Sequence, residues 1–283
     1  MKRLLTFVLL LLISGGIQAQ VKPIVVDLWP DGAPKENGLT GPEQPLENGR
    51  VANISRATLY VYPAAKSGAP AVIACPGGGY RRLAMNHEGH DMATWFNKQG
   101  VTFAVLKYRM PNGDIEIPIS DALQAIRTLR ERAEEWNVDP KRVGIMGASA
   151  GGNLAAQVAT HYTSEEDRPD FQILLYAALT AHKQAAASLF RGDGSDEMLN
   201  HYTPSKQVSE QTPPAILFSS ADDRTVPCRN SIDYFLALRE KGVRAALHIY
   251  PAGGHGWGYE ERMPYKREWT AELERWLAEE VMP

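Results

Sequence analysis

The sequence predicts an α/β fold, with one domain built on a mostly parallel central sheet and helices on both of its faces. Short apolar and β-branched segments alternate along the chain with segments whose apolar residues recur at helical spacing. Such alternation is typical of parallel sheets with helical connections. The 283 residues are 44% hydrophobic and 22% charged, an ordinary globular balance, and no internal repeat or low-complexity tract divides them.

The chain begins with the pattern of an export signal. Lys2 and Arg3 precede the apolar run 4–13, and small residues lead to Ala19. This is the layout of a secretory signal peptide that is cleaved after Ala19. The apolar run is about half of the ~20 residues that a membrane-spanning helix needs. We therefore predict a signal peptide over residues 1–19 and one domain over residues 20–283, located in the periplasm or secreted.

An arm and seven strands are predicted next. Residues 30–49 are rich in Gly, Pro, Asn and Glu, which indicates an extended surface loop. The run 101–108 is apolar and β-branched, as expected of a strand that is buried on both faces. The predicted strands are 58–62, 71–75, 101–108, 142–147, 171–177, 215–220 and 245–250.

Five helices are predicted between and after these strands. Met92, Trp95 and Phe96 share one helical face, and Ser120 is placed to cap a helix with an apolar stripe. Gly242 follows another helix as its terminator. The predicted helices are 89–99, 120–136, 152–161, 231–241 and 263–280.

Charge and cysteine content exclude several functional classes. Lys and Arg number 30 and Asp and Glu number 33, so no basic excess exists to release counterions from a nucleic acid. Cys75 and Cys228 cannot form a CxxC pair, a four-cysteine zinc site or a disulfide framework. We expect both cysteines to be free and buried. No later segment is apolar enough to span a membrane, and we expect no metal or cofactor.

The segment Gly147 to Gly152 carries the first catalytic candidate, Ser149. It reads G-A-S-A-G-G, follows a predicted strand and precedes a predicted helix. A G-x-S-x-G segment in that context places serine on a strained turn, so the residues two before and two after it must be very small. The turn exposes the serine hydroxyl at a helix N-terminus, which favours negative charge on a nearby oxygen. Ser149 is therefore the predicted nucleophile.

A serine hydroxyl needs a base within hydrogen-bond reach, and His255 fits that role best among seven histidines. It directly follows the predicted strand 245–250, and glycines on both sides allow a close approach to another loop. It also comes late in the chain, as the order serine, acid, histidine requires. The acid should follow a strand between Ser149 and His255. Asp222 and Asp223 both do so, and only one can reach His255 because adjacent side chains in an extended segment point apart.

The run Pro76 to Gly79 follows an earlier strand and contains three consecutive glycines. Their N–H groups can converge on a substrate oxygen without Cβ clashes, together with the N–H of Ala150, which follows the nucleophile. This predicts an oxyanion hole. A phosphate-binding loop is disfavoured, because Tyr80-Arg81-Arg82 follows where a Walker loop has Lys and then Ser or Thr.

With these segments, the chain resembles the α/β-hydrolases. It is most similar to exported bacterial acetyl (xylan) esterases, the xylanase-associated esterases near the hormone-sensitive-lipase-like group. The segments that carry the resemblance are 28–34, 76–79, 108–109, 147–152, 223–227 and 254–257. The resemblance implies that the acid is Asp223, from the stretch D-x-x-V-P, and that Gly78 and Gly79 donate to the oxyanion. Pro76 stands where the lipase-like group has His, which favours the acetyl-esterase group.

The resemblance also implies deacetylation of plant cell-wall sugars, with a small-molecule or oligosaccharide ester as substrate. Tyr80 borders the expected acyl site, and Trp257 could stack on a sugar ring or pack in the core. Arg109 is expected to form a structural ion pair. The alternatives are a feruloyl esterase, a serine peptidase of the prolyl-oligopeptidase kind, and a non-catalytic carbohydrate-binding protein on a hydrolase scaffold.

Overall fold

The computed structural model describes residues 22–180, 189–190 and 194–283, so the predicted signal peptide lies outside the described residues. The strands are β1 (Ile24–Asp27), β2 (Gln44–Leu46), β3 (Arg50–Ala52), β4 (Thr58–Tyr62), β5 (Ala69–Cys75), β6 (Arg82–Ala84), β7 (Thr102–Lys107), β8 (Val138–Ala148), β9 (Gln172–Leu175), β10 (Ala215–Ser220) and β11 (Ala245–Tyr250). The helices are η2 (His90–Met92), α1 (Ala93–Lys98), α2 (Glu116–Glu131), α3 (Ala150–His161), α5 (Asp196–His201), α6 (Pro204–Gln207), α7 (Arg229–Glu240) and α8 (Lys266–Trp276), with short turns at η1 (Glu47–Gly49) and η3 (Leu277–Val281).

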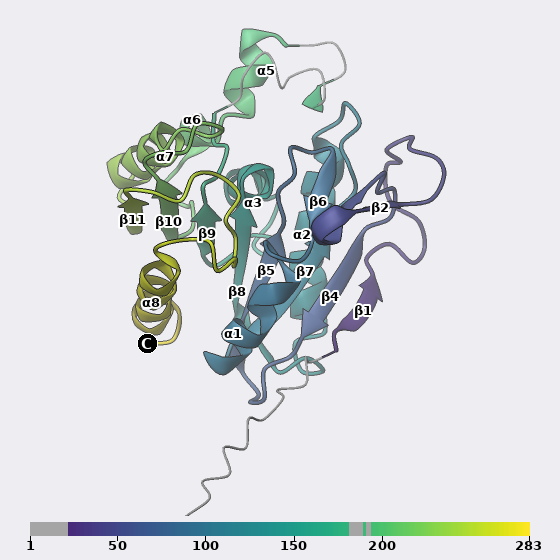
Figure 1. Cartoon of the computed structure of the whole chain (residues 1–283). Coiled ribbons are helices and arrows are strands. Elements are labelled where there is room, and N and C mark those ends of the chain that lie inside the picture. The colour runs from purple at the N-terminus through teal and green to yellow at the C-terminus, as the bar shows by residue number, and fades with distance from the viewer. Residues whose placement is uncertain (1–21, 181–188, 191–193) are drawn as a thin grey trace, which may run out of the picture.

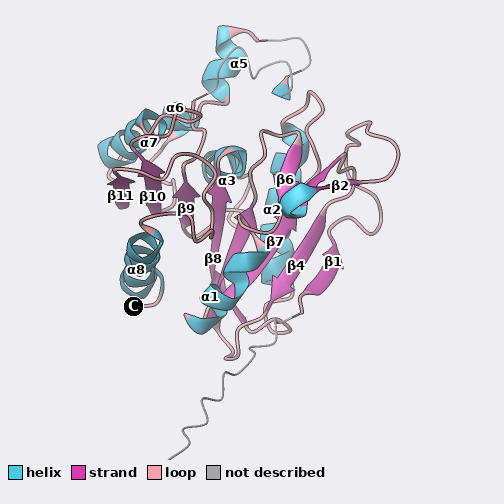
Figure 2. Ribbon diagram, viewed as in Figure 1, coloured by secondary structure: helices cyan, strands magenta, loops and turns pink. Residues whose placement is uncertain are grey.

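Eight of these strands form the main sheet, in the order β1-β4-β7-β5-β8-β9-β10-β11. The six neighbouring strands β7, β5, β8, β9, β10 and β11 are parallel, and β4 and β1 form an antiparallel edge beside β7. In Figures 1 and 2, α1 and α8 cover one face of this sheet, and α2 and α3 cover the other. The mostly parallel α/β architecture predicted from the sequence is confirmed. A three-stranded sheet, β2-β3-β6, is also present.

The predicted elements are present with shifted ends. Strands 58–62, 215–220 and 245–250 match β4, β10 and β11 residue for residue. The predicted helix 263–280 is shorter, because α8 is followed by a π turn at η3. The predicted capping role of Ser120 is wrong: α2 begins four residues earlier, and the Ser120 hydroxyl donates to the Ile117 carbonyl inside the helix (2.7 Å).

Four short strands were not predicted from the sequence. β1, β2, β3 and β6 have three or four residues each, and β2 is fully exposed and lies inside the arm predicted as a loop. Such strands lack the long apolar run that marks a buried parallel strand. Their positions are set by pairing with distant segments, as in the pairing of β3 with β6.

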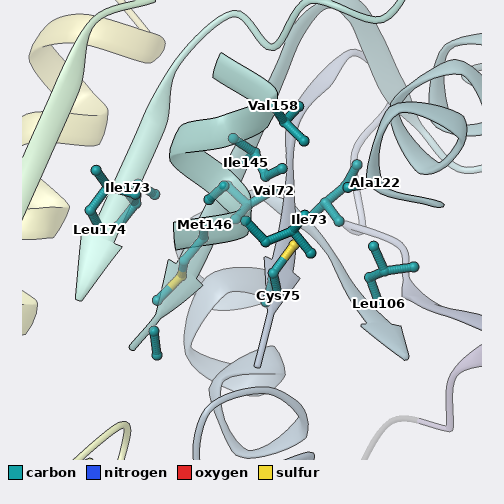
Figure 3. Packing of buried hydrophobic residues seen from close by; sticks show 14 of the residues in the cluster. Val72, Ile73, Cys75, Leu106, Ala122, Ile145, Met146, Val158, Ile173 and Leu174 are labelled. Atoms are coloured by element: carbon teal, nitrogen blue, oxygen red, sulfur yellow. The ribbon is translucent and has the colours of Figure 1, made fainter. Parts of the chain in front are cut away.

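The core is centred on the middle strands of the main sheet. Every residue of β5 is buried, and Figure 3 shows Val72 and Ile73 of this strand among side chains of β8 and β9. Ala122 of α2 and Val158 of α3 belong to the same cluster. The loops at the carboxyl ends of the parallel strands therefore all start from one packed sheet, which comprises β5, β8, β9, β10 and β11.

A buried ion pair anchors the arm between strands β1 and β4 of the main sheet. Arg109 and Asp121 have side chains that are 1% and 0% exposed, and Nη2 of Arg109 lies 2.7 Å from Oδ1 of Asp121. Asp121 also accepts from the Trp29 indole (2.7 Å), and Arg109 donates to the Lys35 carbonyl (2.5 Å). The predicted structural role of Arg109 is confirmed.

Both cysteines are free, as predicted, but only Cys75 is buried, since Cys228 is partly exposed at the start of α7. Burial raises the pKa of the Cys75 thiol well above its usual range. Among the helices of the described residues, none is long and apolar enough to cross a membrane.

Candidate active site

Ser149 occupies a sharp turn between β8 and α3. Its backbone lies at φ 53° and ψ −118°, an unusual conformation for a residue with a side chain. A Cβ atom on Gly147 would lie 2.1 Å from the Gly151 carbonyl oxygen, and one on Gly151 would lie 1.9 Å from the Cys75 carbonyl oxygen. The prediction that only very small residues fit on either side of Ser149 is confirmed.

Ser149, His255 and Asp223 form a continuous line of hydrogen bonds, although they are far apart in the sequence. Oγ of Ser149 lies 2.8 Å from Nε2 of His255, and Nδ1 of His255 lies 2.7 Å from Oδ2 of Asp223. The Asp223 side chain is 1% exposed and that of His255 is 19% exposed. A carboxylate only accepts, so Nδ1 carries the ring proton of neutral His255. Nε2 is then free to accept the Ser149 proton.

The two adjacent carboxylates after β10 have separate partners. The other oxygen of Asp223, Oδ1, accepts from the N–H groups of Thr225 (2.8 Å) and Val226 (2.9 Å). Asp222 points elsewhere and accepts from the N–H of Gly254 (2.8 Å), which precedes His255. Asp223 therefore contacts the imidazole itself, whereas Asp222 fixes the loop that carries it.

The glycine loop after β5 faces the Ser149 hydroxyl with unused donors. In the described part of the chain, no acceptor pairs with the N–H groups of Gly78, Gly79 or Ala150. The Tyr108 hydroxyl donates to the Pro76 carbonyl (2.7 Å) and holds the start of the loop. Unpaired N–H groups beside a nucleophile can accept negative charge that develops on a substrate oxygen.

A buried carboxylate that sequence reasoning missed, Glu88, braces this loop. Its two oxygens accept from the Gly77 N–H (2.7 Å) and from the Tyr176 hydroxyl (2.8 Å). The same hydroxyl accepts from the N–H of Gly258 (2.8 Å), and the Tyr176 ring packs edge-on against His255. Burial raises the pKa of Tyr176 well above its usual range, so the phenol stays a donor to Glu88. Glu88 thus connects the glycine loop to the histidine loop.

Two cavities meet at Ser149, and they differ in chemistry. The first, of about 270 Å³, is mostly apolar, with Ile115, Leu189, Phe190 and Val226 in its wall. The second is lined by His255, His87 and four arginines. Ser149, Gly79 and Thr225 line both. A bound ester can therefore place its two halves in different surroundings, on either side of the serine.

The two residues predicted to bind substrate have different outcomes. Tyr80 lines the apolar cavity, and its hydroxyl donates to Oδ1 of Asn153 (2.8 Å). The stacking role predicted for Trp257 is wrong, because its side chain is completely buried. Its indole N–H donates to Ser220 (3.2 Å), and its ring packs against Tyr176 and Trp269.

Residues 72–258 match the model of a protein family described as having the alpha/beta hydrolase fold. That range contains the glycine loop, Ser149, Asp223 and His255. The chain belongs to the α/β-hydrolase family. This agrees with the resemblance seen in the sequence. Among the described residues, no group of three or more His, Cys, Asp or Glu side chains is arranged to hold a metal ion.

Several proteins of known name are similar to this chain. An acetylxylan esterase of Xylanibacter ruminicola is 38% identical over 216 residues, which cover 73% of this chain and 45% of that protein. Endo-1,4-beta-xylanase B of Butyrivibrio fibrisolvens is 30% identical over 276 residues, covering 85% of this chain and 43% of that protein. The chain thus spans less than half the length of these relatives.

A solved structure matches more completely. The acetyl ester-xyloside bifunctional hydrolase of Caldicellulosiruptor lactoaceticus has a TM-score of 0.75 and 29% identity, covering 92% of this chain and 97% of that one. This α/β-hydrolase is therefore similar in fold and extent to that bifunctional hydrolase.

Proposed function

We propose that this α/β-hydrolase is a serine carboxylic ester hydrolase that removes acetyl groups from acetylated carbohydrate of the xylan type. The observation that carries the proposal is the line of hydrogen bonds from Ser149 through His255 to Asp223, at 2.8 Å and 2.7 Å. The names of the acetylxylan esterase and acetyl ester hydrolase that it resembles support the acetyl group and the sugar.

The reaction proceeds in two halves. Nε2 of His255 takes the hydroxyl proton as Oγ of Ser149 attacks the ester carbonyl carbon, and the resulting oxyanion accepts from Gly78, Gly79 and Ala150. Asp223 stabilises the imidazolium without taking its proton. The ester C–O bond breaks as His255 protonates the leaving alkoxide. Water then attacks the acetyl-serine by the same proton route and releases acetate.

A second candidate is suggested by the apolar cavity. Its volume of about 270 Å³ is larger than an acetyl group fills. Its lining includes the aromatic side chains of Tyr80, Phe190 and Tyr202. A longer or aromatic acyl group, such as a feruloyl group, would bury more apolar surface there.

The test is a substrate panel. It comprises p-nitrophenyl esters from acetyl to octanoyl, acetylated xylo-oligosaccharides, a feruloyl ester and an aminoacyl-naphthylamide. We expect the highest kcat/KM among the acetyl esters and release of acetate from the oligosaccharides. Faster cleavage of the feruloyl ester favours the second candidate, and faster cleavage of the naphthylamide favours a peptidase. A protein that stays unlabelled by a fluorophosphonate contradicts serine catalysis and favours the non-catalytic binding protein.

The proposal includes action outside the cytoplasm. It rests on the signal-like pattern of residues 1–19. N-terminal sequencing of the exported protein tests it, since cleavage after Ala19 leaves Gln20 as the first residue.

Glu88 is a positioning residue in this scheme, and its removal has a predicted cost. Glu88→Ala leaves the Gly77 N–H and the Tyr176 hydroxyl without their acceptor, at about 1–3 kcal/mol for each buried group. We expect kcat for p-nitrophenyl acetate to fall by about 10- to 100-fold, with little change in KM, because the loop carrying the oxyanion donors loses its brace.

Glu88→Gln is the matched control, since its amide oxygen can still accept from the Gly77 N–H and its NH₂ group can donate to the Tyr176 oxygen, which leaves only the Tyr176 hydroxyl proton without its acceptor. We expect it to recover part of the lost kcat. If both variants lower thermal stability while kcat stays at the wild-type value, Glu88 has a structural role only.

A further inference from the structure

The second cavity at Ser149 carries an unusual concentration of positive charge. Arg50, Arg81, Arg82 and Arg262 all line it, in a chain whose net charge is −3. The small sheet brings two of them together: Arg50 begins β3, Arg82 begins β6, and these strands pair with each other. Arg81 directly precedes β6. The three-stranded sheet that the sequence did not predict thus places arginines beside the serine.

Three of these guanidinium groups are unpaired. Arg81 and Arg82 are exposed and Arg50 is half-buried, and among the described residues none of the three side chains has a hydrogen-bond or ion-pair partner. Arg262 is occupied, because it donates to the Gly256 carbonyl (2.6 Å) and pairs with Glu260. Like charges gathered in one cavity repel one another, and an anion bound among them relieves that repulsion.

Among the described residues that line this cavity, no carboxylate pairs with Arg50, Arg81 or Arg82. Glu88 is the acidic residue in its lining, and both of its oxygens already accept from Gly77 and Tyr176. The guanidinium donors therefore remain available to a ligand. A planar guanidinium fits a carboxylate with two parallel hydrogen bonds.

The proton route decides which half of the ester enters this cavity. His255 must protonate the leaving alkoxide, so the alcohol portion lies on the side of Nε2. His255 lines the basic cavity and does not line the apolar one. The acyl group then occupies the apolar cavity, and the alcohol portion extends among the arginines.

We propose that the preferred substrates are esters whose alcohol portion carries a carboxylate, bound by Arg50, Arg81 and Arg82. An acetylated oligosaccharide with a uronic acid residue has this chemistry. The inference rests on the proposed esterase function and adds a substrate class to it. In this proposal the β2-β3-β6 sheet positions the arginines that bind the acidic sugar.

The test compares two acetate esters that differ in charge, 4-acetoxyphenylacetate and its primary amide. At low ionic strength we expect kcat/KM for the anion to exceed that for the amide by about tenfold, since each exposed arginine contributes a few-fold. The ratio should approach one as salt is raised to about 0.5 M, because exposed charges are screened. Acetylated xylo-oligosaccharides with and without a glucuronic acid branch should show the same preference.

Variants locate the effect. Arg81→Gln combined with Arg82→Gln should lower the anion-to-amide ratio to about two, and adding Arg50→Gln should bring it to one. Arg267→Gln is the matched control: Arg267 is exposed on α8 and lines neither cavity, so the wild-type ratio should persist. The ratio cancels any general effect of a variant on turnover.

Each other outcome overturns a defined statement. Equal hydrolysis of the two esters by the wild type at low salt, or an unchanged ratio in the triple variant, overturns the carboxylate preference and leaves the esterase function intact. Strong preference for 4-acetoxyphenyl phosphate over the carboxylate overturns the acidic-sugar assignment in favour of a phosphate. If neither acetate ester is cleaved, the proposed function itself is wrong.

Discussion

Ser149→Ala is expected to lower kcat for p-nitrophenyl acetate by about 10⁶-fold, because a nucleophile, base and acid that act as a unit lose nearly everything with one member. The Ser149 side chain makes no capping bond to α3, and within the described part of the chain its hydroxyl is paired with His255 alone. Alanine also keeps the Cβ that the turn already accommodates. We therefore expect the thermal unfolding midpoint to change by only a few degrees, so the loss is chemical.

Ser67→Ala is the control for this experiment. Ser67 precedes β5, at the amino end of the parallel strands, whereas Ser149 follows the carboxyl end of β8. The control should keep wild-type turnover. Burst kinetics add an independent check, since the wild type should accumulate an acetyl-enzyme that Ser149→Ala cannot form. Residual turnover within tenfold of the wild type would contradict Ser149 as the nucleophile.

The sequence supported the fold and the serine turn because local sterics determine both. Strands β10 and β11 are short and mainly apolar, and Gly147 is required by its contact with the Gly151 carbonyl in the same turn, whereas Gly151 is required by the close approach of the Cys75 carbonyl at the end of β5. The start of helix α2 was harder to predict from the sequence. Asp114 accepts from the Glu116 N–H (3.1 Å), so α2 begins there and Ser120 falls inside it.

Long-range contacts explain what the sequence did not reveal. Glu88 accepts hydrogen bonds from Gly77 and from Tyr176. Tyr176 lies 88 residues after Glu88 along the chain, and no local sequence pattern indicates such a pairing. Trp257 lies two residues beyond His255 but is buried by packing on Trp269. The basic cavity likewise depends on the pairing of β3 with β6, which neither strand indicates by itself.

Asp223→Asn is expected to lower kcat by about 10⁴-fold, because the amide cannot satisfy all of the present donors. If its oxygen faces His255, its NH₂ group meets the N–H groups of Thr225 and Val226, which already donate to Oδ1. If it turns over, its NH₂ group faces Nδ1 and favours the tautomer with the proton on Nε2. That tautomer cannot accept the Ser149 proton.

The neighbouring carboxylate provides the matched comparison. Asp222 uses Oδ1 to accept from the Gly254 N–H (2.8 Å), and the oxygen of an asparagine can accept that bond equally. We expect Asp222→Asn to stay within about threefold of the wild-type kcat, since a single neutral hydrogen bond contributes about 0.5–1.5 kcal/mol and here it is retained. Equal losses in the two variants would mean that the charge of the loop, and not contact with Nδ1, supports the imidazolium. A large loss in Asp222→Asn alone would assign the orienting role to the other aspartate.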